Sequence, residues 1–480
     1  MVKQSLTRNI LFSSLKRLFE VLVPIITIPY LSKTLLPDGI GQVNFVKSYI
    51  AYFVIIAEFG LSGYGTREIT RQRNSKETLS KVTKELFSIS LISTFAAYIL
   101  FFISLFLFNK LQPYLSLLLL YSISIFLTTL GMEWLFRGLG EFKYISIRYL
   151  IFRILMLILM FVFVKNENNI KEYFLVFMVG SSLPNIFNFL YSFKFINWKT
   201  VVPLVYKHHL KSLLFFWWHT ISITIYELTD VTMLGLMSTN TEVAYYSTTH
   251  KFVFMVNALL CNVTMTAIPH AVHYIEVQNS EGYMELLKNI GNFLLMFSIP
   301  LSFLCFLLSK DIIVLFCGLL FLPSYIIMNI LALSICPFLF AGFIGNLILL
   351  PYRKEKITMF VNLCAAILNC ILNYILILYY SAIGAAISSI ISQYIVCLFY
   401  YVYTRSMISY KHLLSNIMQY FCASISMIII VLLLKYSIST LLLRLILCTV
   451  LGILVYMLSL ILMKNIYMIN FYKKILTRRR

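Results

Sequence analysis

The chain has 480 residues, of which 60% are hydrophobic and 12% are charged, and its formal net charge is +21. A soluble protein of this length has too little interior for so many apolar side chains, so an integral membrane protein is indicated. Nucleic-acid binding is not expected, because the positive charge is spread over short connections between apolar segments and forms no single soluble patch.

Fourteen segments are long and apolar enough to cross a bilayer as α-helices. A crossing takes about 20 residues, because a helix rises about 1.5 Å per residue through about 30 Å of hydrocarbon. The segments lie near residues 12–34, 41–63, 86–108, 114–136, 147–164, 173–193, 213–236, 244–268, 288–309, 322–350, 359–379, 383–403, 416–435 and 441–463. Pro337 interrupts the tenth segment, and a count of twelve stays open. The expected fold class is an all-α integral membrane protein with about 14 transmembrane helices.

Basic residues are concentrated in alternate connections between these segments. The basic set covers residues 3–17, 67–84, 137–148, 194–211, 288, 353–356, 405–411 and the tail 464–480. The opposite set holds only Lys33, Lys110, Lys165, Lys171, Lys310 and Lys435. Positively charged loops remain in the cytoplasm, so the pattern predicts a multi-pass protein with both termini cytoplasmic.

Two weak internal similarities divide the chain into halves. Residues 38–45 resemble 241–246 at an offset of 203, and residues 141–143 resemble 355–356 at an offset of 214. Transporters are often built from such repeated halves, and parallel repeats are related by a pseudo-twofold axis along the membrane normal. The predicted domains are therefore as follows: an N-lobe over 1–205 with helices 1–6, a C-lobe over 206–412 with helices 7–12, and helices 13–14 with a basic tail over 413–480.

No catalytic, cofactor or metal site is expected from the sequence. No extramembrane segment exceeds about 20 residues, and no GxxxxGK[ST] motif is present, so the chain is not expected to be an enzyme or to use ATP directly. The nine cysteines lie between Cys261 and Cys448 without a CxxC pair. His270 and His273 share a helix face, but no third ligand is evident.

An ordered set of short motifs carries a family resemblance. The motifs are PIITIPYL at 24–31, LPDGIG at 36–41, EFGL at 58–61, GTREI at 65–69, EWLFRG at 133–138, FKYI at 142–145, TDVTMLG at 229–235, EV at 242–243, YRKEK at 352–356 and IGAAI at 383–387. In order and spacing this set resembles the Wzx-type polysaccharide flippases of the MOP (MATE-like) superfamily, over roughly residues 10–410.

The resemblance implies a V-shaped bundle of two six-helix lobes in the bacterial plasma (inner) membrane. It also implies translocation of polyprenyl-diphosphate-linked oligosaccharide repeat units, for O-antigen or capsule, by ion-coupled alternating access. The implied partners are an undecaprenyl-diphosphate-linked oligosaccharide, a proton or sodium ion, the lipid bilayer and other proteins of polysaccharide assembly. Helices 13 and 14 resemble the additional pair of the fourteen-span lipid II flippases.

Two other functions predict different sequence features. A drug/cation antiporter of the same fold predicts a less cationic cavity, with carboxylates that lack lysine partners. A membrane glycosyl-polymerase or ligase predicts a sizeable outer loop with Arg, His or acidic residues. The outer connections here are short and nearly uncharged, which disfavours the enzyme.

Cations inside the predicted spans form the candidate substrate site. Lys47 lies on the second span, and the offset of 203 maps it onto His250, beside Lys251, in the other half. Charges in a span are costly, at about 2.5–3.5 kcal/mol near the bilayer centre, so they usually face protein or water. One cation from each lobe would match the negative charge of a diphosphate group. The alternative is that these cations form ion pairs with carboxylates of span 7, which would only fix the packing.

Carboxylates inside the spans are candidates for ion coupling or gating. Glu227 and Asp230 are three residues apart on the seventh span, and close carboxylates tend to hold a proton. The alternative is a fixed counter-charge. Glu58 shares a helix face with the lysine of the second span, near its cytoplasmic end, and is a candidate gate with Arg67 or Arg71.

Two arginines near the cytoplasmic ends of spans complete the candidate set. Arg153 on span 5 and Arg17 on span 1 are placed to contact the substrate headgroup, and the alternative is that they snorkel to the interface. On span 1, Lys16 and Glu20 have the i,i+4 spacing of a local ion pair.

Overall fold

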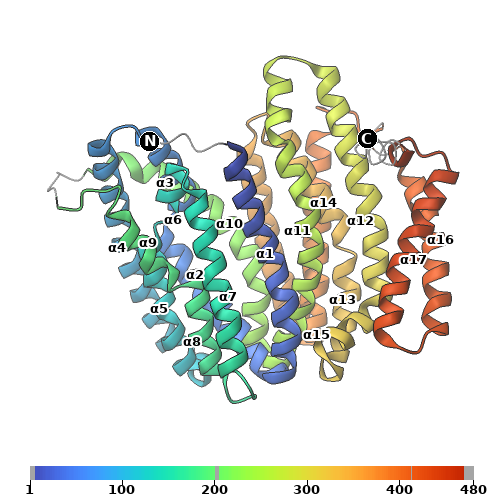
Figure 1. The fold of residues 1–480 in the computed structure, drawn as a ribbon, viewed down its shortest axis with the longest axis horizontal. Helices are drawn as coiled ribbons and strands as arrows, with labels where there is room; N and C mark the ends of the chain where they lie inside the picture. Colours follow the sequence, from blue (N-terminus) through green and yellow to red (C-terminus); the bar gives the residue numbers. More distant parts are fainter. Residues whose placement is uncertain (1–5, 200–204, 412, 414, 470–480) are drawn as a thin grey trace. The chain divides into compact units, whose positions relative to one another are not determined.

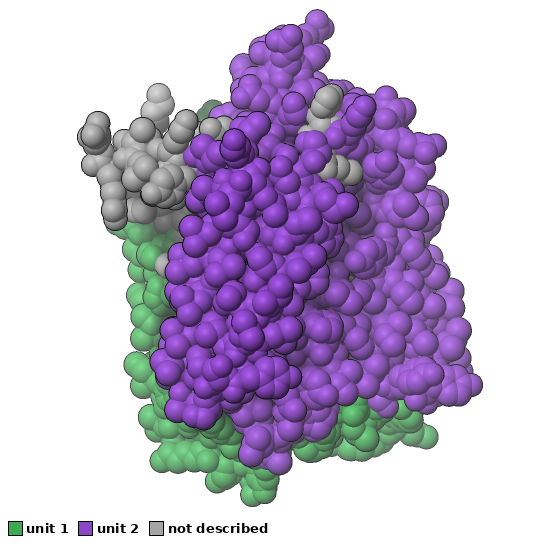
Figure 2. Space-filling view, turned by 90° about the vertical axis from the view of Figure 1, so that its right-hand side faces the viewer, with its two compact units in different colours: residues 1–244 green, residues 245–480 purple. Residues whose placement is uncertain are grey.

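The structure is a computed structural model that describes residues 6–199, 205–411, 413 and 415–469. Within these ranges it does not describe the side chains of residues 6–11, 13, 14, 17, 18, 21, 223 and 225–227. All regular secondary structure in the described part is helical (Figure 1). The chain divides into two compact units, residues 1–244 and 245–480, which Figure 2 shows in green and purple.

Unit 1 contains ten α-helices in the described residues, and its central helix is α2. The elements are α1 (Leu6–Thr34), α2 (Leu36–Glu58), α3 (Leu61–Gln72), α4 (Lys76–Leu107), the 3-10 helix η1 (Asn109–Tyr114), α5 (Leu115–Gly131), α6 (Glu133–Leu139), α7 (Phe142–Phe163), α8 (Ile170–Ser181), α9 (Pro184–Ser192) and α10 (Lys207–Met237). α2 packs against α4, α5 and α10, while α1 packs against α7 and α3 packs against α6.

Three spans of unit 1 are each interrupted. The span 36–72 consists of α2 and α3, the span 109–139 of η1, α5 and α6, and the span 170–192 of α8 and α9. The first interruption has left-handed backbone at Phe59 (φ 43°) and Gly60 (φ 75°), and the second has it at Met132 (φ 39°). A non-glycine residue in this conformation costs about 1–2 kcal/mol, so these breaks are specified by the surrounding packing.

The first interruption also changes the sequence-based interpretation of the basic connection that follows span 2. Residues 65–72 were expected in a loop, but they belong to the helix α3. The helix forms because Leu61, Tyr64 and Ile69 occupy one face and pack against α6 and α4, which leaves the basic side chains on the other face.

Unit 1 has a distinct hydrophobic core around α3 and α6. Its buried members come also from the first turns of α4 and α7, and they include Tyr64, Ile69, Leu86, Leu135 and Phe136. Aromatic rings fill a different region, between the middle of α2 and α4. They follow one another as Phe45, Tyr49, Phe53 and Phe101, with ring centroids 5.3–6.1 Å apart.

The first turn of α2 is held tightly against the start of α11 (Asn240–Glu276). A Cβ added at Gly41 would collide with the main-chain carbonyl of Asn240, so only glycine permits this approach. The Asn240 side chain donates to Asp38 Oδ1 (2.9 Å) and accepts from the Tyr114 hydroxyl (2.6 Å). The LPDGIG motif therefore has a structural role in joining α2 to the connection between α10 and α11.

Replacing Gly41 with alanine is expected to reduce strongly the amount of folded protein, because neither backbone can retreat without breaking the Asn240 contacts. Overpacking of this kind costs about 1–3 kcal/mol or more. Size-exclusion chromatography and thermal unfolding of the detergent-solubilised protein would measure the effect. Gly342→Ala is the matched control, because a Cβ there meets no atom within 4 Å. A Gly41→Ala protein that unfolds at the wild-type temperature would contradict the prediction.

Unit 2 is built around α12. Its elements are the remainder of α11, then α12 (Ser280–Cys317), the 3-10 helix η2 (Leu319–Ser324), α13 (Tyr325–Ala332), α14 (Ile335–Ile344), the π-helix η3 (Gly345–Leu349), α15 (Glu355–Thr404), α16 (Ile417–Ser437) and α17 (Leu441–Leu462). α12 packs against α13 and α14, and α15 covers α13 and α14.

The C-terminal pair α16–α17 packs on α12, as Figure 1 shows at the edge of unit 2. Polar contacts reinforce the apolar interface: Lys435 Nζ donates to the Leu307 carbonyl (2.7 Å), and Arg444 lies 3.5 Å from Asp311. The pair is therefore an integral part of this unit.

Eleven helices of the described residues are long and apolar enough to cross a membrane. The 50-residue α15 covers two predicted spans, 359–379 and 383–403, and the non-helical Ser381 (φ 47°, ψ −127°) lies between them. α1 and α10 contain side chains that are not described. The chain is thus a multi-pass membrane protein, while the count of fourteen and the domain limits at 205 and 412 stay predictions.

Candidate functional site

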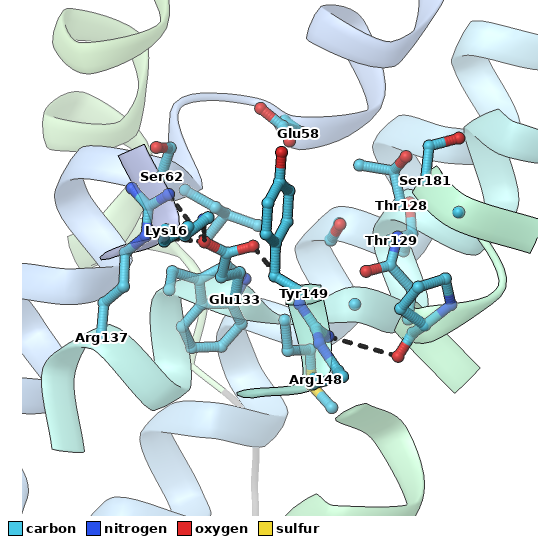
Figure 3. A pocket seen from close by; sticks show the side chains of 18 of the residues that line it. Lys16, Glu58, Ser62, Thr128, Thr129, Glu133, Arg137, Arg148, Tyr149 and Ser181 are labelled. Atoms are coloured by element: carbon cyan, nitrogen blue, oxygen red, sulfur yellow. Dashed lines mark hydrogen bonds and ion pairs between the residues drawn. The ribbon is translucent and has the colours of Figure 1, made fainter. Parts of the chain in front are cut away.

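Unit 1 encloses a polar cavity of about 290 Å³ (Figure 3). Side chains of α1, α4, α7 and the three interrupted spans line it. Its polar lining consists of Lys16, Glu58, Ser62, Ser90, Thr128, Thr129, Glu133, Trp134, Arg137, Arg148, Tyr149, Arg153, Ser181 and Asn185. Such a concentration of charge between apolar helices is expensive, and it marks a candidate binding site.

All three helix interruptions of unit 1 border this cavity. The lining includes residues on both sides of each break: 58 and 61, 131 and 133, and 181 and 184. The 12-residue α3 and the 9-residue α9 therefore begin at the cavity. Helix N-termini carry free N–H groups and a partial positive charge, which favour an anionic ligand.

Glu133, the first residue of α6, is the centre of the charge cluster. Its Oε1 accepts hydrogen bonds from Arg137 Nε (3.1 Å) and Nη2 (2.8 Å) and from Lys16 Nζ (3.3 Å). Its Oε2 lies 3.7 Å from Arg148 Nη2. Figure 3 shows Lys16 and Arg137 on one side of the carboxylate, and Thr128, Thr129 and Ser181 across the cavity. One carboxylate thus faces three cations from α1, α6 and α7.

The cavity is electropositive as a whole, since four cations line it against the two carboxylates Glu58 and Glu133. Arg153 makes no ion pair within 4.0 Å among the described residues. Its Nε is buried without a hydrogen-bond partner, and its guanidinium faces the Tyr149 ring at 5.2 Å. Its Nη1 donates to the Met156 sulfur (3.5 Å), so among the described side chains Arg153 is a cation of this cavity without an acidic partner.

The structure also brings Arg153 near Lys47 through one aromatic side chain. Lys47 Nζ lies 3.3 Å from the ring centroid of Phe177, and the Arg153 guanidinium lies 5.9 Å from the same centroid. Tyr173 stacks on Phe177 and also faces Lys47. Both cations thus make cation–π contacts with the same Phe177 ring. Lys47 does not line the cavity itself, so the two predicted cations occupy neighbouring positions along unit 1.

The predicted cations of the second half lie on α11 in unit 2. The His250 ring stacks on Tyr246 with a centroid separation of 5.8 Å and an interplanar angle of 16°, and Phe254 flanks its other side at 6.4 Å. Lys251 follows it on the same helix and is half-buried. Their predicted role opposite Lys47 stays a prediction.

The structure describes only some of the other predicted carboxylates and arginines. Asp230 lies buried on α10 in unit 1, with 5% of its surface exposed. The side chains of Glu227 and Arg17 lie outside the described residues. Glu58 lines the cavity, whereas Arg71 pairs with the neighbouring Glu68 of α3 at 3.5 Å.

The centre of the cavity was not assigned from the sequence. The predicted local pair of Lys16 and Glu20 is confirmed at 4.0 Å, but Lys16 lies closer to Glu133 at 3.3 Å. The i,i+4 spacing of Glu133 and Arg137, at the end of an apolar run, is the signal that points to this centre. Arg148 had no such signal, because its partner lies on another helix.

Comparison with known families and proteins gives consistent matches. A family model described as polysaccharide biosynthesis protein matches residues 6–274. Two relatives are each described as a putative O-antigen transporter. The one from Escherichia coli (strain K12) is 23% identical over 407 residues, which cover 80% of this chain and 92% of the relative. The one from Shigella dysenteriae is 23% identical over 386 residues, which cover 78% of this chain and 94% of the relative.

Two solved structures show the fold. The lipid II flippase MurJ in its inward closed conformation aligns with a TM-score of 0.73 at 18% identity, and covers 95% of this chain and 99% of that chain. An inward-facing multidrug resistance MATE family transporter of the MOP superfamily aligns with a TM-score of 0.58 at 15% identity, covering 84% and 98%. The all-helical fold is therefore that of MurJ and the MATE transporters.

Proposed function

The chain belongs to the polysaccharide biosynthesis protein family, and from this premise we propose that it is a flippase for lipid-linked oligosaccharides. It translocates polyprenyl-diphosphate-linked repeat units from the cytoplasmic to the outer leaflet for the synthesis of a cell-surface polysaccharide. Both relatives are named as O-antigen transporters, and the first structural neighbour is named as a lipid II flippase, which supports this class of substrate. The protein is accordingly a transporter and not an enzyme.

The observation that carries the proposal is the positive cavity in unit 1. A diphosphate bridge has several anionic oxygens, and guanidinium groups bind such oxygens through charge-assisted hydrogen bonds. Arg153 Nε has no hydrogen-bond partner among the described residues, and the N-terminus of α3 adds a partial positive charge at the same cavity. Serine and threonine hydroxyls on the opposite wall, and the Tyr149 hydroxyl beside the cations, are suited to contact the first sugar.

We assign the remaining predicted cations to the path of the headgroup. Lys47 extends the positive surface of unit 1 beyond the cavity, and His250 and Lys251 are the cations of unit 2 on the same path. Arg17 is the cation of α1 in the same role. A two-lobed transporter that rocks between inward and outward states would pass the diphosphate between these groups.

Coupling to a proton or sodium ion is assigned to the carboxylates. Glu58 lines the same cavity as the cations, so its charge interacts directly with the charge that a diphosphate brings. Asp230 and Glu227, which lie one turn apart on α10, are the second candidate pair. Either location would link ion binding to occupation by substrate.

The charge of the cavity argues against a drug/cation antiporter. Four cations against two carboxylates would repel a cationic drug, whereas they attract an anionic headgroup. The fold is shared with MATE transporters, so the lining of the cavity decides between these two functions.

The proposed location is the bacterial plasma membrane, with both chain termini in the cytoplasm. The basic connections support this orientation through the positive-inside rule. In this arrangement the protein works beside other proteins of polysaccharide assembly, which supply repeat units inside and polymerise them outside.

Deletion of the gene is expected to trap finished repeat units on the cytoplasmic leaflet, because no other step moves the headgroup across the membrane. Accessibility of the undecaprenyl-diphosphate oligosaccharide to an enzyme added outside spheroplasts measures its leaflet. Normal surface polymer, or repeat units that accumulate only outside, would contradict the proposal.

The same deletion strain allows a narrower test. Complementation by Lys47→Gln and Lys251→Gln is expected to restore less surface polysaccharide than the wild type. Complementation by Lys354→Gln, an exposed lysine before α15, provides the control. Full activity of the Lys47 and Lys251 variants at normal protein level would remove these residues from the substrate path.

A further inference from the structure

A second polar cluster of unit 1 lies at the start of α10, apart from the cavity. His209 Nε2 lies 3.1 Å from Glu85 Oε2 on α4, and His208 is its neighbour in the chain. One ligand atom from each of these three residues lies within 4.8 Å of the others. Glu85 and His209 are buried at 1% and 0% exposure, while His208 is exposed. Burial thus holds Glu85 and His209 in place, whereas the exposed His208 side chain can change its rotamer.

The second polar atom of each buried side chain, Nδ1 of His209 and Oε1 of Glu85, already contacts another group. The Tyr64 hydroxyl of α3 lies 2.7 Å from His209 Nδ1, and the Val205 N–H donates to Glu85 Oε1 at 3.0 Å. Metal-ligating histidines usually have their second ring nitrogen engaged in this way, which fixes the ring and leaves Nε2 for the metal. The remaining Oε2 and Nε2 point to each other.

The charge of Glu85 is also incompletely balanced. No lysine or arginine lies within ion-pair distance of its carboxylate among the described residues, and His209 is its sole ionisable partner there. A buried carboxylate is costly unless a cation pairs with it. Neutral imidazole and ionised carboxylate are also the forms that ligate a metal.

We propose that Glu85, His208 and His209 bind a divalent transition metal of the zinc type. Two imidazoles and one carboxylate form a donor set that zinc accepts, with water in the fourth position on the exposed side. Two ligands of a tetrahedral zinc ion lie about 3.3 Å apart, close to the observed separation of Nε2 and Oε2. Rotation of the exposed His208 side chain completes the set. The bound ion joins α10 to α4, and through Tyr64 to α3.

Zinc binding by the purified full-length protein tests the proposal independently of transport. The protein is prepared in detergent without a polyhistidine tag, stripped with a chelator, and titrated with Zn²⁺ against a chromophoric zinc indicator. We expect one zinc ion per chain and a higher thermal unfolding temperature with zinc, since a ligand that binds the folded state stabilises it.

His208→Ala is the decisive variant, because its exposed side chain is not needed for folding. It is expected to bind zinc about tenfold or more weakly and to lose the thermal shift. Glu85→Gln should do the same, and it retains the size of the side chain. His273→Ala, which removes an exposed histidine of α11, is the matched control and should bind like the wild type. Equal zinc binding by the His208→Ala protein, or no zinc retained by the wild type, would overturn the proposal.

Discussion

Replacement of Arg153 with glutamine is expected to reduce transport of lipid-linked repeat units by roughly tenfold or more, without loss of protein from the membrane. The reason is that Arg153 has no carboxylate partner among the described residues, so its donors are available to the diphosphate. A hydrogen bond to a charged group contributes about 1.5–3 kcal/mol, which corresponds to about ten- to a hundredfold. Recovery of surface polysaccharide in a deletion strain, relative to protein level on immunoblots, measures the effect.

Two further variants test whether the loss of transport is specific to position 153 and to the guanidinium group. Lys143→Gln removes an exposed cation from the same helix, α7, outside the cavity, and should transport like the wild type. Arg153→Lys keeps the charge but loses the planar fork, so we expect partial activity. A glutamine variant with wild-type transport would show that Arg153 only contacts its aromatic neighbours.

Replacement of Glu133 with glutamine is expected to destabilise unit 1, by about 1–3 kcal/mol. The carboxylate compensates Lys16, Arg137 and Arg148, which otherwise face one another in a cavity closed off by apolar helices. The side chain remains 30% exposed, so the loss is smaller than for a fully buried ion pair. A lower thermal unfolding temperature in detergent is the expected result.

A double-mutant cycle separates this charge effect from other consequences of the substitution. Glu133→Gln combined with Arg137→Gln should recover part of the lost stability, because one uncompensated cation is removed. Transport should stay low in the double variant, since the cavity has lost its organised cations. Glu167→Gln, an exposed position between α7 and α8, is the stability control. Additive losses in the double variant would argue against a charge cluster centred on Glu133.

The sequence was sufficient for the membrane class, the helical fold and the location of the basic connections, because hydropathy and charge are properties of short segments. It also identified the LPDGIG motif, although not its structural reason. Gly41 and Asn240 lie almost 200 residues apart, and their close contact depends on tertiary packing. Arg153 and Glu58 were selected as ionisable residues in spans, and the structure places both at one cavity.

The helix interruptions could not be predicted in the same way. Gly60 and Pro184, at the first and third breaks, are residues that end helices. Phe59 and Met132 are not, and both adopt left-handed backbone because packing imposes it. Glu133 was consequently assigned to the continuous end of a span. Its central position in the charge cluster depends on Lys16 and Arg148, which approach the same carboxylate from two other helices.

The interruptions of α2, α5 and α8 require hydration. Each leaves carbonyl and N–H groups without helical partners, and such backbone in a membrane protein is tolerated only when it is buried in protein or lines a water-filled space. The polar cavity beside all three breaks is that space. The middle of α2, in contrast, is filled by the packed rings of Phe45, Tyr49 and Phe53. Backbone groups at these breaks can therefore hydrogen-bond a polar group that enters the cavity and replaces water there.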